Sequence, residues 1–411
     1  MPQRLLFWRK LFTFMTWLSF RRNSSASGVV TTTATTINAS TVALRLECAL
    51  WSFLAGDALA SPTHWYYGGY VQIDRDYPGG VRDYTKPVER LAGSILNKSN
   101  LQGGGRSSSA SSLKQNLPSI IGEVINHGKQ NLWSPDKSIH YHATLQAGEN
   151  TLEVQLARIL MKSIVQMGGV FDEDHFRQAY IDFMTTPGSH NDTYASTCHR
   201  MFFANLVHHK LPPKECPDND YHNVDTIDGL VLPSIVSLAA AARGTFSVRE
   251  VQDQAAACAA VTRKSVPLQR AARSWSSLLH NLLLDDGSTS VEEIVEQAAH
   301  KGGVRLTRGR DHITACYLDS AYPALLNGVV LYSDETVWNA LLANANVGGE
   351  NVHRGSCLGA ALGARHESLD ALGSDRLITG LIPQSELSQE IRSFVAAVMV
   401  STNECAAGSE S

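Results

Sequence analysis

Three glycines spaced four residues apart, Gly355, Gly359 and Gly363, constrain the fold of this chain more strongly than any other feature. Residues four apart lie on one face of a helix, so these glycines form a bare face against which a second helix can pack closely. The polar segment 346–354, NVGGENVHR, precedes them and contains a glycine pair suited to a tight turn. We expect a rigid turn at the bottom of a helical bundle, with the first N–H groups of the helix facing an anion or metal site. The simpler interpretation is a glycine turn between two packed helices.

The composition predicts a globular protein without a nucleic-acid surface. The chain has 411 residues, of which 43% are hydrophobic and 18% charged, enough to bury one large core or two ordinary ones. Its formal net charge is only -4, and the sequence has no basic stripe with interleaved aromatic residues. The seven cysteines lie far apart without a C-x-x-C pair, which is typical of reduced thiols in an intracellular compartment.

Residues 1–40 differ in composition from the rest of the chain. No acidic residue precedes Glu47, and basic residues flank the apolar stretch 11–20, which is too short to span a bilayer, so we expect no transmembrane segment. A Ser/Thr-rich linker follows this stretch. The composition predicts an organellar targeting peptide, for a mitochondrion or a plastid. A secretory signal, an interfacial anchor and a tail of a cytoplasmic protein are the alternatives.

Apolar residues recur with a helical period along the remaining body, residues 41–411. The period is clear over residues 42–54, 152–164, 239–294 and 319–345. No segment alternates as a strand does, and residues 97–116, rich in Ser, Gly and Asn, are expected to form an exposed insertion. The sequence thus predicts one all-α domain, a single compact orthogonal helical bundle, and gives no support to a Rossmann or barrel fold.

The tripeptide Gly-Glu-Asn occurs twice, at residues 148–150 and 349–351, each time ahead of an apolar helix. Acidic and amide side chains are common helix caps at such positions, because the helix dipole is positive there. The repetition of the same tripeptide favours a second interpretation, in which both segments contribute to one site. The middle segment 186–194, TPGSHNDTY, is also dense in polar side chains.

Four stretches together resemble the ADP-ribosylglycohydrolase and crystallin J1 superfamily. They are residues 56–59, GDAL, residues 148–151, GENT, residues 223–233 and residues 346–364, in the order found in that family. The resemblance implies a compact all-α fold with a cleft that holds two divalent ions, magnesium or manganese. It also implies cleavage of the glycosidic bond between ADP-ribose and a protein side chain or small molecule.

This sequence departs from the family at the expected metal ligands. The family's Thr-Asp-Asp-Thr matches residues 148–151, and its Gly-Gly-Asp-Thr-Asp-Thr matches residues 348–353. Two carboxylates are retained as Glu149 and Glu350. Four expected oxygen ligands are replaced, by Gly148, Asn150, Val352 and His353. A magnesium site built from oxygen ligands should be weakened by these changes, unless Asp57, Asp192, Asp225 or Asp228 folds into the cleft.

The resemblance assigns candidate residues to the site. The catalytic candidates are Glu149, Glu350 and Asp57. The substrate-binding candidates are Asn150, Asn223, Gly348, Gly349, Asn351 and His353. The candidate ligands of a single metal ion are Glu149, Asn150, Glu350 and His353. In a mechanism without metal, Glu149 and Glu350 would be the general acid and base.

Three functions are consistent with these residues. The first is hydrolysis of an ADP-ribosyl N- or O-glycosidic bond, with altered or lost metal dependence, on small-molecule or protein-linked ADP-ribose. The second is a non-catalytic, crystallin J1-like ligand-binding or structural protein. The third is a hydrolase of an unrelated substrate. The aromatic run Trp65, Tyr66 and Tyr67 supplies either stacking partners for adenine or core side chains.

Overall fold

A computed structural model describes residues 37–104, 117–134, 137–306 and 316–399, all within the unit Ile37–Ser411. This described part is helical and has no β-strand, because its extended pairings are isolated bridges. The all-α prediction is therefore confirmed. Nearly all of the expected targeting peptide and most of the expected insertion 97–116 lie outside the described residues.

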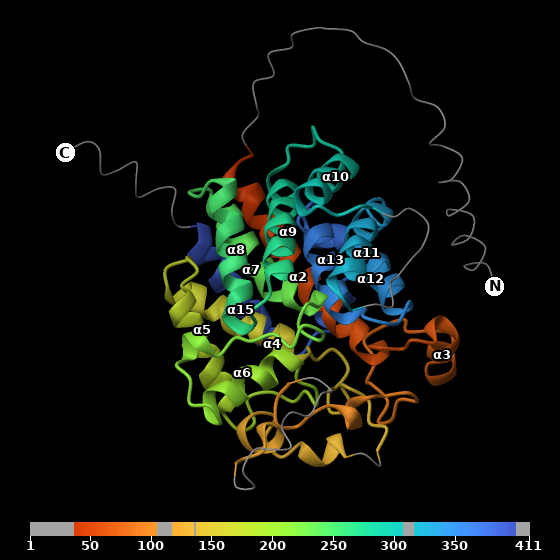
Figure 1. Ribbon diagram of the computed structural model, residues 1–411. Helices are drawn as coiled ribbons and strands as arrows, with labels where there is room; N and C mark the ends of the chain where they lie inside the picture. Colours follow the sequence, from red (N-terminus) through yellow and green to blue (C-terminus); the bar gives the residue numbers. More distant parts are fainter. Residues whose placement is uncertain (1–36, 105–116, 135–136, 307–315, 400–411) are drawn as a thin grey trace, which may run out of the picture. The chain divides into compact units, whose positions relative to one another are not determined.

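Long helices alternate with irregular loops along the described chain (Figure 1). The α-helices are α2 (Ala39–Ala60), α3 (Gly69–Asp76), α4 (Leu152–Gln166), α5 (Glu173–Thr185), α6 (Thr197–Val207), α7 (Val231–Arg243), α8 (Val248–Thr262), α9 (Val266–Leu284), α10 (Val291–Gly302), α11 (Leu318–Leu331), α12 (Val337–Ala345), α13 (Val352–Gly363), α14 (Arg376–Thr379) and α15 (Gln384–Met399). The predicted helical segments correspond to α2, α4, α7 to α9, α11 and α12.

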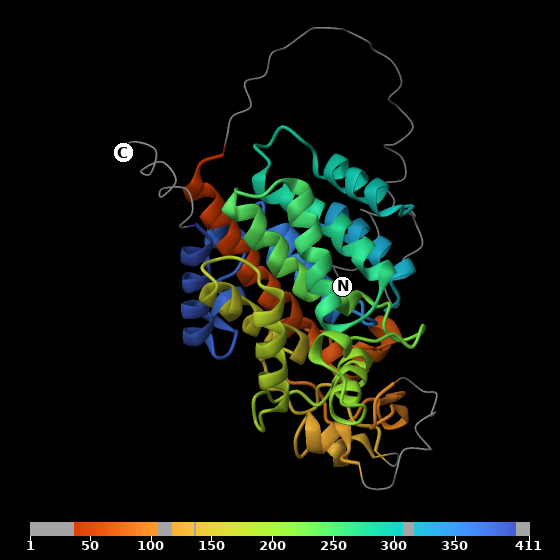
Figure 2. The same cartoon turned by 60° about the vertical axis from the view of Figure 1, so that its left-hand side comes forward.

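Helix α2 is the element around which the other helices pack. Asn38 caps its N-terminus by accepting a hydrogen bond from the Thr41 N–H at 2.8 Å. Every residue from position 48 to position 60 is buried, which is typical of a helix surrounded by other elements. Helices α7, α9, α12, α13 and α15 all contact it, and Figures 1 and 2 show it crossing among them.

The predicted glycine face of α13 packs directly on α2. An added Cβ would lie 2.4 Å from the Gly56 carbonyl oxygen at Gly355 and 2.1 Å from the Ser52 carbonyl oxygen at Gly359. At Gly363 it would lie 2.5 Å from the Cys48 carbonyl oxygen. No side chain fits at such distances, so the two backbones touch along three turns. The close helix pair predicted from the glycine spacing is confirmed.

Helices α7 to α10 pack against one another and, through α7 and α9, against α2. Two of them begin with a capping box, in which the helix-cap serine and a glutamate three residues later satisfy each other's backbone N–H groups. The pairs are Ser247 with Glu250 at α8 and Ser290 with Glu293 at α10. These caps fix where the helices start, so the apolar faces of α8 and α10 align with the core.

Residues 77–151 lie between α3 and α4, and the described part of this segment, 77–104, 117–134 and 137–151, contains no α-helix. Figures 1 and 2 show this orange-to-yellow segment at one end of the long helices, beside α6. Its short turns are held to the loop between α5 and α6, because Trp133 Nε1 and Asn126 Nδ2 both donate to the Thr193 carbonyl, at 3.1 and 2.8 Å. This pairing brings two irregular segments to the end of α2, where the candidate site lies.

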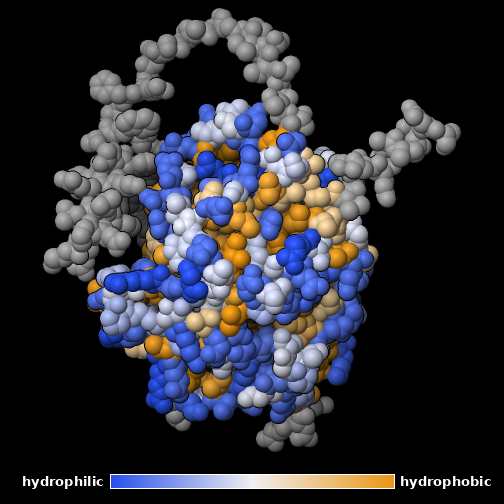
Figure 3. Space-filling view, turned by 180° about the vertical axis from the view of Figure 1, so that it is seen from behind, coloured by the Kyte–Doolittle hydropathy of each residue, from blue (hydrophilic) through white to orange (hydrophobic). Residues whose placement is uncertain are grey.

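The surface of the described residues is mixed in polarity. On the face in Figure 3, hydrophilic residues predominate in the lower part and apolar residues are more frequent in the upper part. Scattered large apolar side chains are exposed, among them Val71, Tyr221 and Val266. No helix of the described residues is long and apolar enough to cross a membrane.

Candidate functional site

The candidate site forms where the chain leaves α2 and where it enters α13. The Trp65 N–H donates to the Gly349 carbonyl at 2.7 Å, and the Gly349 N–H donates to the Tyr66 carbonyl at 3.3 Å. Gly348 has a left-handed φ of 77°, and a Cβ there would lie 2.5 Å from the Tyr66 oxygen. The tight glycine turn predicted from the sequence therefore holds the start of α13 against the loop after α2.

Glu350, the residue after this turn, is clamped between two histidines. Its Oε2 lies 3.0 Å from His64 Nε2, and its Oε1 lies 2.5 Å from His353 Nδ1. All three side chains are buried. Burial alone would raise the pKa of Glu350, but the two imidazoles hold it well below its usual value. Burial lowers the pKa of His64 to about 4, while Glu350 outweighs burial and raises the pKa of His353 to about 10.

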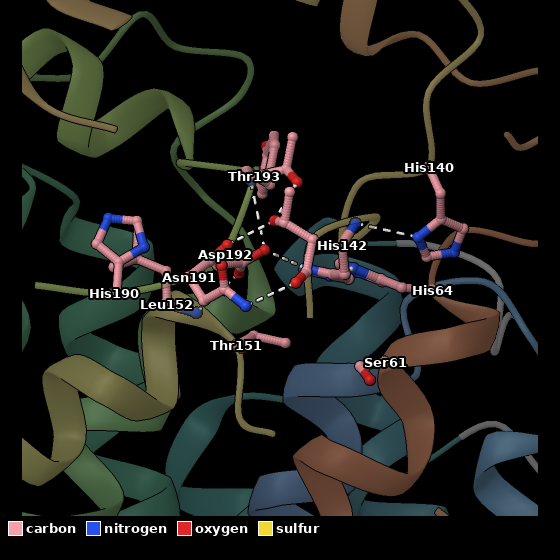
Figure 4. Close-up of polar contacts among 12 residues, drawn as sticks. Ser61, His64, His140, His142, Thr151, Leu152, His190, Asn191, Asp192 and Thr193 are labelled. Atoms are coloured by element: carbon pink, nitrogen blue, oxygen red, sulfur yellow. Dashed lines mark hydrogen bonds and ion pairs between the residues drawn. The ribbon is translucent and has the colours of Figure 1, made fainter. Parts of the chain in front are cut away.

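A second carboxylate holds His64 from its other side through an intervening histidine. His64 Nδ1 lies 2.6 Å from His142 Nε2, and His142 Nδ1 lies 2.8 Å from Asp192 Oδ1. The other oxygen of Asp192 accepts the Leu152 N–H at the start of α4, at 2.8 Å. Figure 4 shows His142 between Asp192 and His64. The five side chains Asp192, His142, His64, Glu350 and His353 thus form one buried chain of polar contacts, the carboxylate–histidine chain.

Aromatic rings enclose the carboxylate–histidine chain. Trp65 stacks on His64 with ring centroids 4.2 Å apart, and it meets Tyr141 and Tyr194 edge-on. Trp65 also has a φ of 59°, a left-handed conformation that is unfavourable for a bulky residue. Such strain persists only where the surrounding structure enforces it, and it concentrates at functional sites. Of the predicted aromatic run, Tyr66 is core, Trp65 lines this chain and Tyr67 is exposed.

Asp57, predicted as a catalytic carboxylate, is a structural anchor in this geometry. Its Oδ1 accepts from Thr151 Oγ1 at 2.6 Å, and its Oδ2 accepts from the Thr151 N–H and from Asn150 Nδ2, at 2.7 and 3.0 Å. The side chain is fully buried, and burial raises its pKa. With both oxygens engaged, Asp57 ties α2 to the start of α4 and presents no free oxygen to a substrate.

The two asparagines of the repeated tripeptide also act as anchors. Asn150 Nδ2 donates to the Leu54 carbonyl at 2.8 Å, and Asn351 Nδ2 donates to Thr63 Oγ1 at 2.7 Å. Their side-chain oxygens are buried and have no hydrogen-bond partner. Unpaired buried acceptors are costly, so these oxygens are positions for a donor from water or a ligand. Both helices α4 and α13 start one or two residues later, as predicted.

The two glutamates of the repeated tripeptide do not meet in one cluster. Glu149 is half-buried and accepts from Asn191 Nδ2 at 3.1 Å, whereas Glu350 lies in the carboxylate–histidine chain. Glu149 lines a cavity of about 490 Å³, a size suited to a small-molecule ligand. Other residues lining this cavity are Lys129, Arg158, His190, Asn191 and Glu386. The expected single site is therefore divided between a solvent-accessible carboxylate and a buried one.

Asn223 and the carboxylates proposed as replacement ligands separate in the structure. Asn223 lies in a loop and donates to Asp220 Oδ2 at 2.7 Å. Asp228 forms a buried ion pair with Arg263, 3.0 Å long. Asp192 is the one that joins the carboxylate–histidine chain.

A pair of magnesium ions does not fit the residues at this site. Within the described residues, the donor side chains close enough to hold an ion are His64, Glu350 and His353. Magnesium prefers oxygen ligands, and this group offers two imidazoles and one carboxylate. At the matching family positions the Val352 side chain has no donor atom, Asn150 donates to Leu54 and Asp57, and Glu149 lies outside the group. The predicted ligand set therefore retains Glu350 and His353 and must add His64.

Sequence reasoning missed His64 and His142 as site residues. Both lie in irregular segments, Thr63-His64-Trp65 and His140-Tyr141-His142, where no periodicity indicates which way a side chain points. Only the neighbouring residues could have indicated a site, because each histidine lies beside aromatic residues that could enclose it. Asp192 is one of the predicted replacement ligands, but nothing in the sequence indicates its hydrogen bond with His142.

The fold and the site define an α-helical protein whose polar centre lies between the ends of two helices joined by a glycine face. A profile of the ADP-ribosylglycohydrolase family matches residues 39–371, and the chain belongs to this family. Among solved structures, a chain from an "ADP-ribosylglycohydrolase-related protein complex" is similar, with a TM-score of 0.51 and 14% identity, covering 87% of this chain and 99% of that chain. At this identity the likeness concerns the fold alone. No curated protein matches the sequence.

Proposed function

We propose that this protein hydrolyses an N- or O-glycosidic bond of an ADP-ribosylated molecule, with the cavity beside Glu149 as the substrate site. The observation that carries the proposal is the position of Glu149, a half-buried carboxylate at a family motif position that lines a cavity of about 490 Å³. Family membership supports a hydrolase function.

The cavity contains the groups that such a reaction needs. Hydrolysis of a glycosidic bond requires a base that takes a proton from the attacking water and an acid that protonates the leaving group. Glu149, whose Oε2 is oriented by Asn191, is the base in this scheme, since water reaches the cavity; once protonated, it passes that proton to the leaving group and so also acts as the acid. Lys129 lines the same cavity and suits a diphosphate, whereas Arg158, also at the cavity, is already paired with Glu386 and Glu390. Glu350 has both oxygens engaged and does not act directly on substrate in this scheme.

The test is release of free ADP-ribose by the full-length protein from arginine-linked and serine-linked ADP-ribosyl peptides and from O-acetyl-ADP-ribose. General acid–base catalysis contributes about 10²- to 10⁴-fold, so Glu149→Gln should lower kcat by about a hundredfold or more. Glu215→Gln is the control, because Glu215 is exposed and does not line the cavity. Its kcat should stay within a few-fold of the unmodified protein.

The outcomes separate the alternative functions. Equal loss in both variants would remove Glu149 from the mechanism. Binding of ADP-ribose without turnover of any substrate would establish the non-catalytic, crystallin J1-like alternative. Neither binding nor turnover would reject ADP-ribose as the ligand and favour a hydrolase of an unrelated substrate.

We further propose that residues 1–40 direct the chain to a mitochondrion or plastid. Their basic, acid-free and Ser/Thr-rich composition supports this proposal. A fusion of these residues to a fluorescent reporter tests it directly. Organellar fluorescence that is lost when Arg4, Arg9 and Lys10 are replaced by glutamine is expected, and diffuse fluorescence would favour a cytoplasmic protein.

A further inference from the structure

We propose that His64, Glu350 and His353 form a binding site for one divalent transition-metal ion, of the zinc class. The site is separate from the cavity beside Glu149, and the proposal does not depend on which bond the protein cleaves. It rests on three observations: the spacing of the donor atoms, the direction in which His64 is held, and the chemical nature of the donors.

The donor atoms have the spacing that a small cation requires. One ligand atom from each residue can be chosen so that all lie within 4.8 Å of one another. His64 Nε2 and Glu350 Oε2 are 3.0 Å apart. An ion about 2.0–2.2 Å from each ligand places neighbouring ligand atoms roughly 3 Å apart. Side-chain adjustments that bring the widest pair, up to 4.8 Å apart, to this spacing would let the cluster surround an ion.

Hydrogen bonding fixes the direction of the His64 lone pair. Ionised Asp192 can only accept, so His142 Nδ1 must donate to it, and in the tautomer with this single N–H the His142 Nε2 is an acceptor. His64 Nδ1 then donates to His142 Nε2, which leaves the lone pair of neutral His64 on Nε2. That lone pair faces the carboxylate oxygen of Glu350. Two acceptors at this distance require a cation between them, either a proton or a metal ion.

The arrangement behind His64 is the kind found around metal-binding histidines. Such a histidine usually donates its second ring N–H to a partner that fixes its tautomer and orientation. Here that partner is His142, itself oriented by Asp192, whose second oxygen is fixed by the Leu152 N–H. Asp192 is thus a positioning residue. Because all members are buried and the ring orientations are fixed by these contacts, the ligands are held in place before an ion binds.

The donor types select the class of ion. Two imidazoles and one carboxylate favour zinc and other late first-row divalent ions, whereas magnesium and calcium favour oxygen donors. Three protein ligands also leave at least one coordination position for water or a substrate oxygen. His353 replaces the family's hydroxyl, Val352 replaces its carboxylate, and His64 is added from the loop after α2, so the preferred ion changes from magnesium to a transition metal.

The test is metal binding by the full-length protein after removal of bound metal with a chelator. Titration with Co²⁺ should give visible d–d absorption that saturates at one equivalent, and Zn²⁺ should displace it. Mg²⁺ at a hundredfold excess should not displace the bound Co²⁺. The readout is spectroscopic and does not depend on activity, so the metal-binding proposal can hold even if the proposed hydrolysis is not observed.

Three variants locate the ion. His64→Gln and His353→Gln should each weaken Co²⁺ binding by at least a hundredfold, because each removes a ligand. Asp192→Asn should weaken it about 10- to 100-fold, as expected for a residue that orients a ligand. His280→Asn is the control, because this partly buried histidine on α9 contacts Asn281 outside the cluster, and its affinity should be unchanged.

The proposal is independent of whether the variants fold. Far-ultraviolet circular dichroism identifies any variant that has lost its helices. Metal binding by the unmodified protein is enough by itself to test the proposal. If it binds no Co²⁺ or Zn²⁺ stoichiometrically, or if Mg²⁺ competes at equal concentration, the cation between His64 and Glu350 is a proton and the proposal is rejected. Unchanged Co²⁺ affinity in a folded His64→Gln protein would reject it as well.

Discussion

His64 and His142 stack with their rings nearly parallel, 9° between planes, and with Nδ1 and Nε2 2.6 Å apart, although 78 residues separate them in the chain. Both rings are buried, so water does not reach them. The contact makes the loop after α2 and the segment before α4 one unit. It also transmits the orientation set by Asp192 to Glu350.

This contact predicts a characteristic proton resonance. The His142 Nδ1 proton is buried and donates to the carboxylate of Asp192, so it should exchange slowly and resonate downfield of the backbone amides. Asp192→Asn should abolish that resonance, whereas His280→Asn should retain it. A proton spectrum of the unmodified protein without any downfield imidazole signal would contradict the hydrogen-bond assignment.

The glycine face of α13 predicts a large difference between two glycine-to-alanine variants. Gly359→Ala would put a Cβ 2.1 Å from the Ser52 carbonyl oxygen, and the backbones of α2 and α13 would have to separate, so we expect a loss of about 3 kcal/mol or more in the free energy of unfolding. Gly328→Ala on α11 meets only Leu358 at 3.8 Å and should be neutral or stabilising by up to about 1 kcal/mol. Urea unfolding measures both. Similar stabilities would show that α13 can move away from α2 at little cost.

Asp57→Asn tests whether this carboxylate is an anchor. The amide group would turn one acceptor into a donor facing Asn150 or Thr151, and at least one buried donor would lose its partner, at a cost of about 2–3 kcal/mol. Asp334→Asn is the control, since Asp334 is exposed, and should change stability by less than about 0.5 kcal/mol. Stability is read from chemical unfolding followed by circular dichroism. Full stability with lost hydrolysis in Asp57→Asn would instead restore the catalytic role predicted from the sequence.

The buried Asp228–Arg263 pair predicts how stability depends on pH. Burial alone would raise the pKa of Asp228, but Arg263 outweighs burial and lowers it to about 2. A carboxyl group with a lowered pKa stabilises the folded state above its unfolded pKa, about 3.8, and loses that contribution as the pH falls through its folded pKa.

The contribution of Asp228 ionisation to the free energy of unfolding should be about 2 kcal/mol at pH 6 and about 1 kcal/mol at pH 3. The stability difference between the unmodified protein and Asp228→Asn should shrink accordingly between pH 5 and pH 3, in unfolding curves at each pH. A constant difference over this range would show that the carboxyl group has an ordinary pKa.

Helix positions were predictable because they depend on local pattern. The apolar period from residue 42 and from residue 152 indicated α2 and α4, and the spacing of Gly355, Gly359 and Gly363 indicated a close helix partner. Which helix would be that partner was not predictable. The contact depends on Gly56, a single glycine almost three hundred residues earlier, whose role becomes visible only when the helices pack.

The site was predictable in its sequence motifs but not in its connections. Glu350 and His353 follow from the family motif, and the structure brings them together. The separation of Glu149 from Glu350 did not follow, because a tripeptide repeated in sequence need not face the same direction in space. His64 and His142 lie in loops whose paths are set by long-range contacts such as that between Trp65 and Gly349.

The packing of α13 on α2 also sets the order in which the protein can become functional during synthesis. His64 leaves the ribosome early, yet its partner Glu350 follows 286 residues later. Contacts so distant in sequence form late, because the intervening chain must first be ordered. A nascent or truncated chain that stops before the glycine turn at residues 348–349 carries most of the helices and most of the cavity lining around Glu149. It lacks Glu350, His353, the helix that locks α2, and the lining residues Pro383 and Glu386. Translation of the last quarter of the chain therefore decides whether a finished site exists at all.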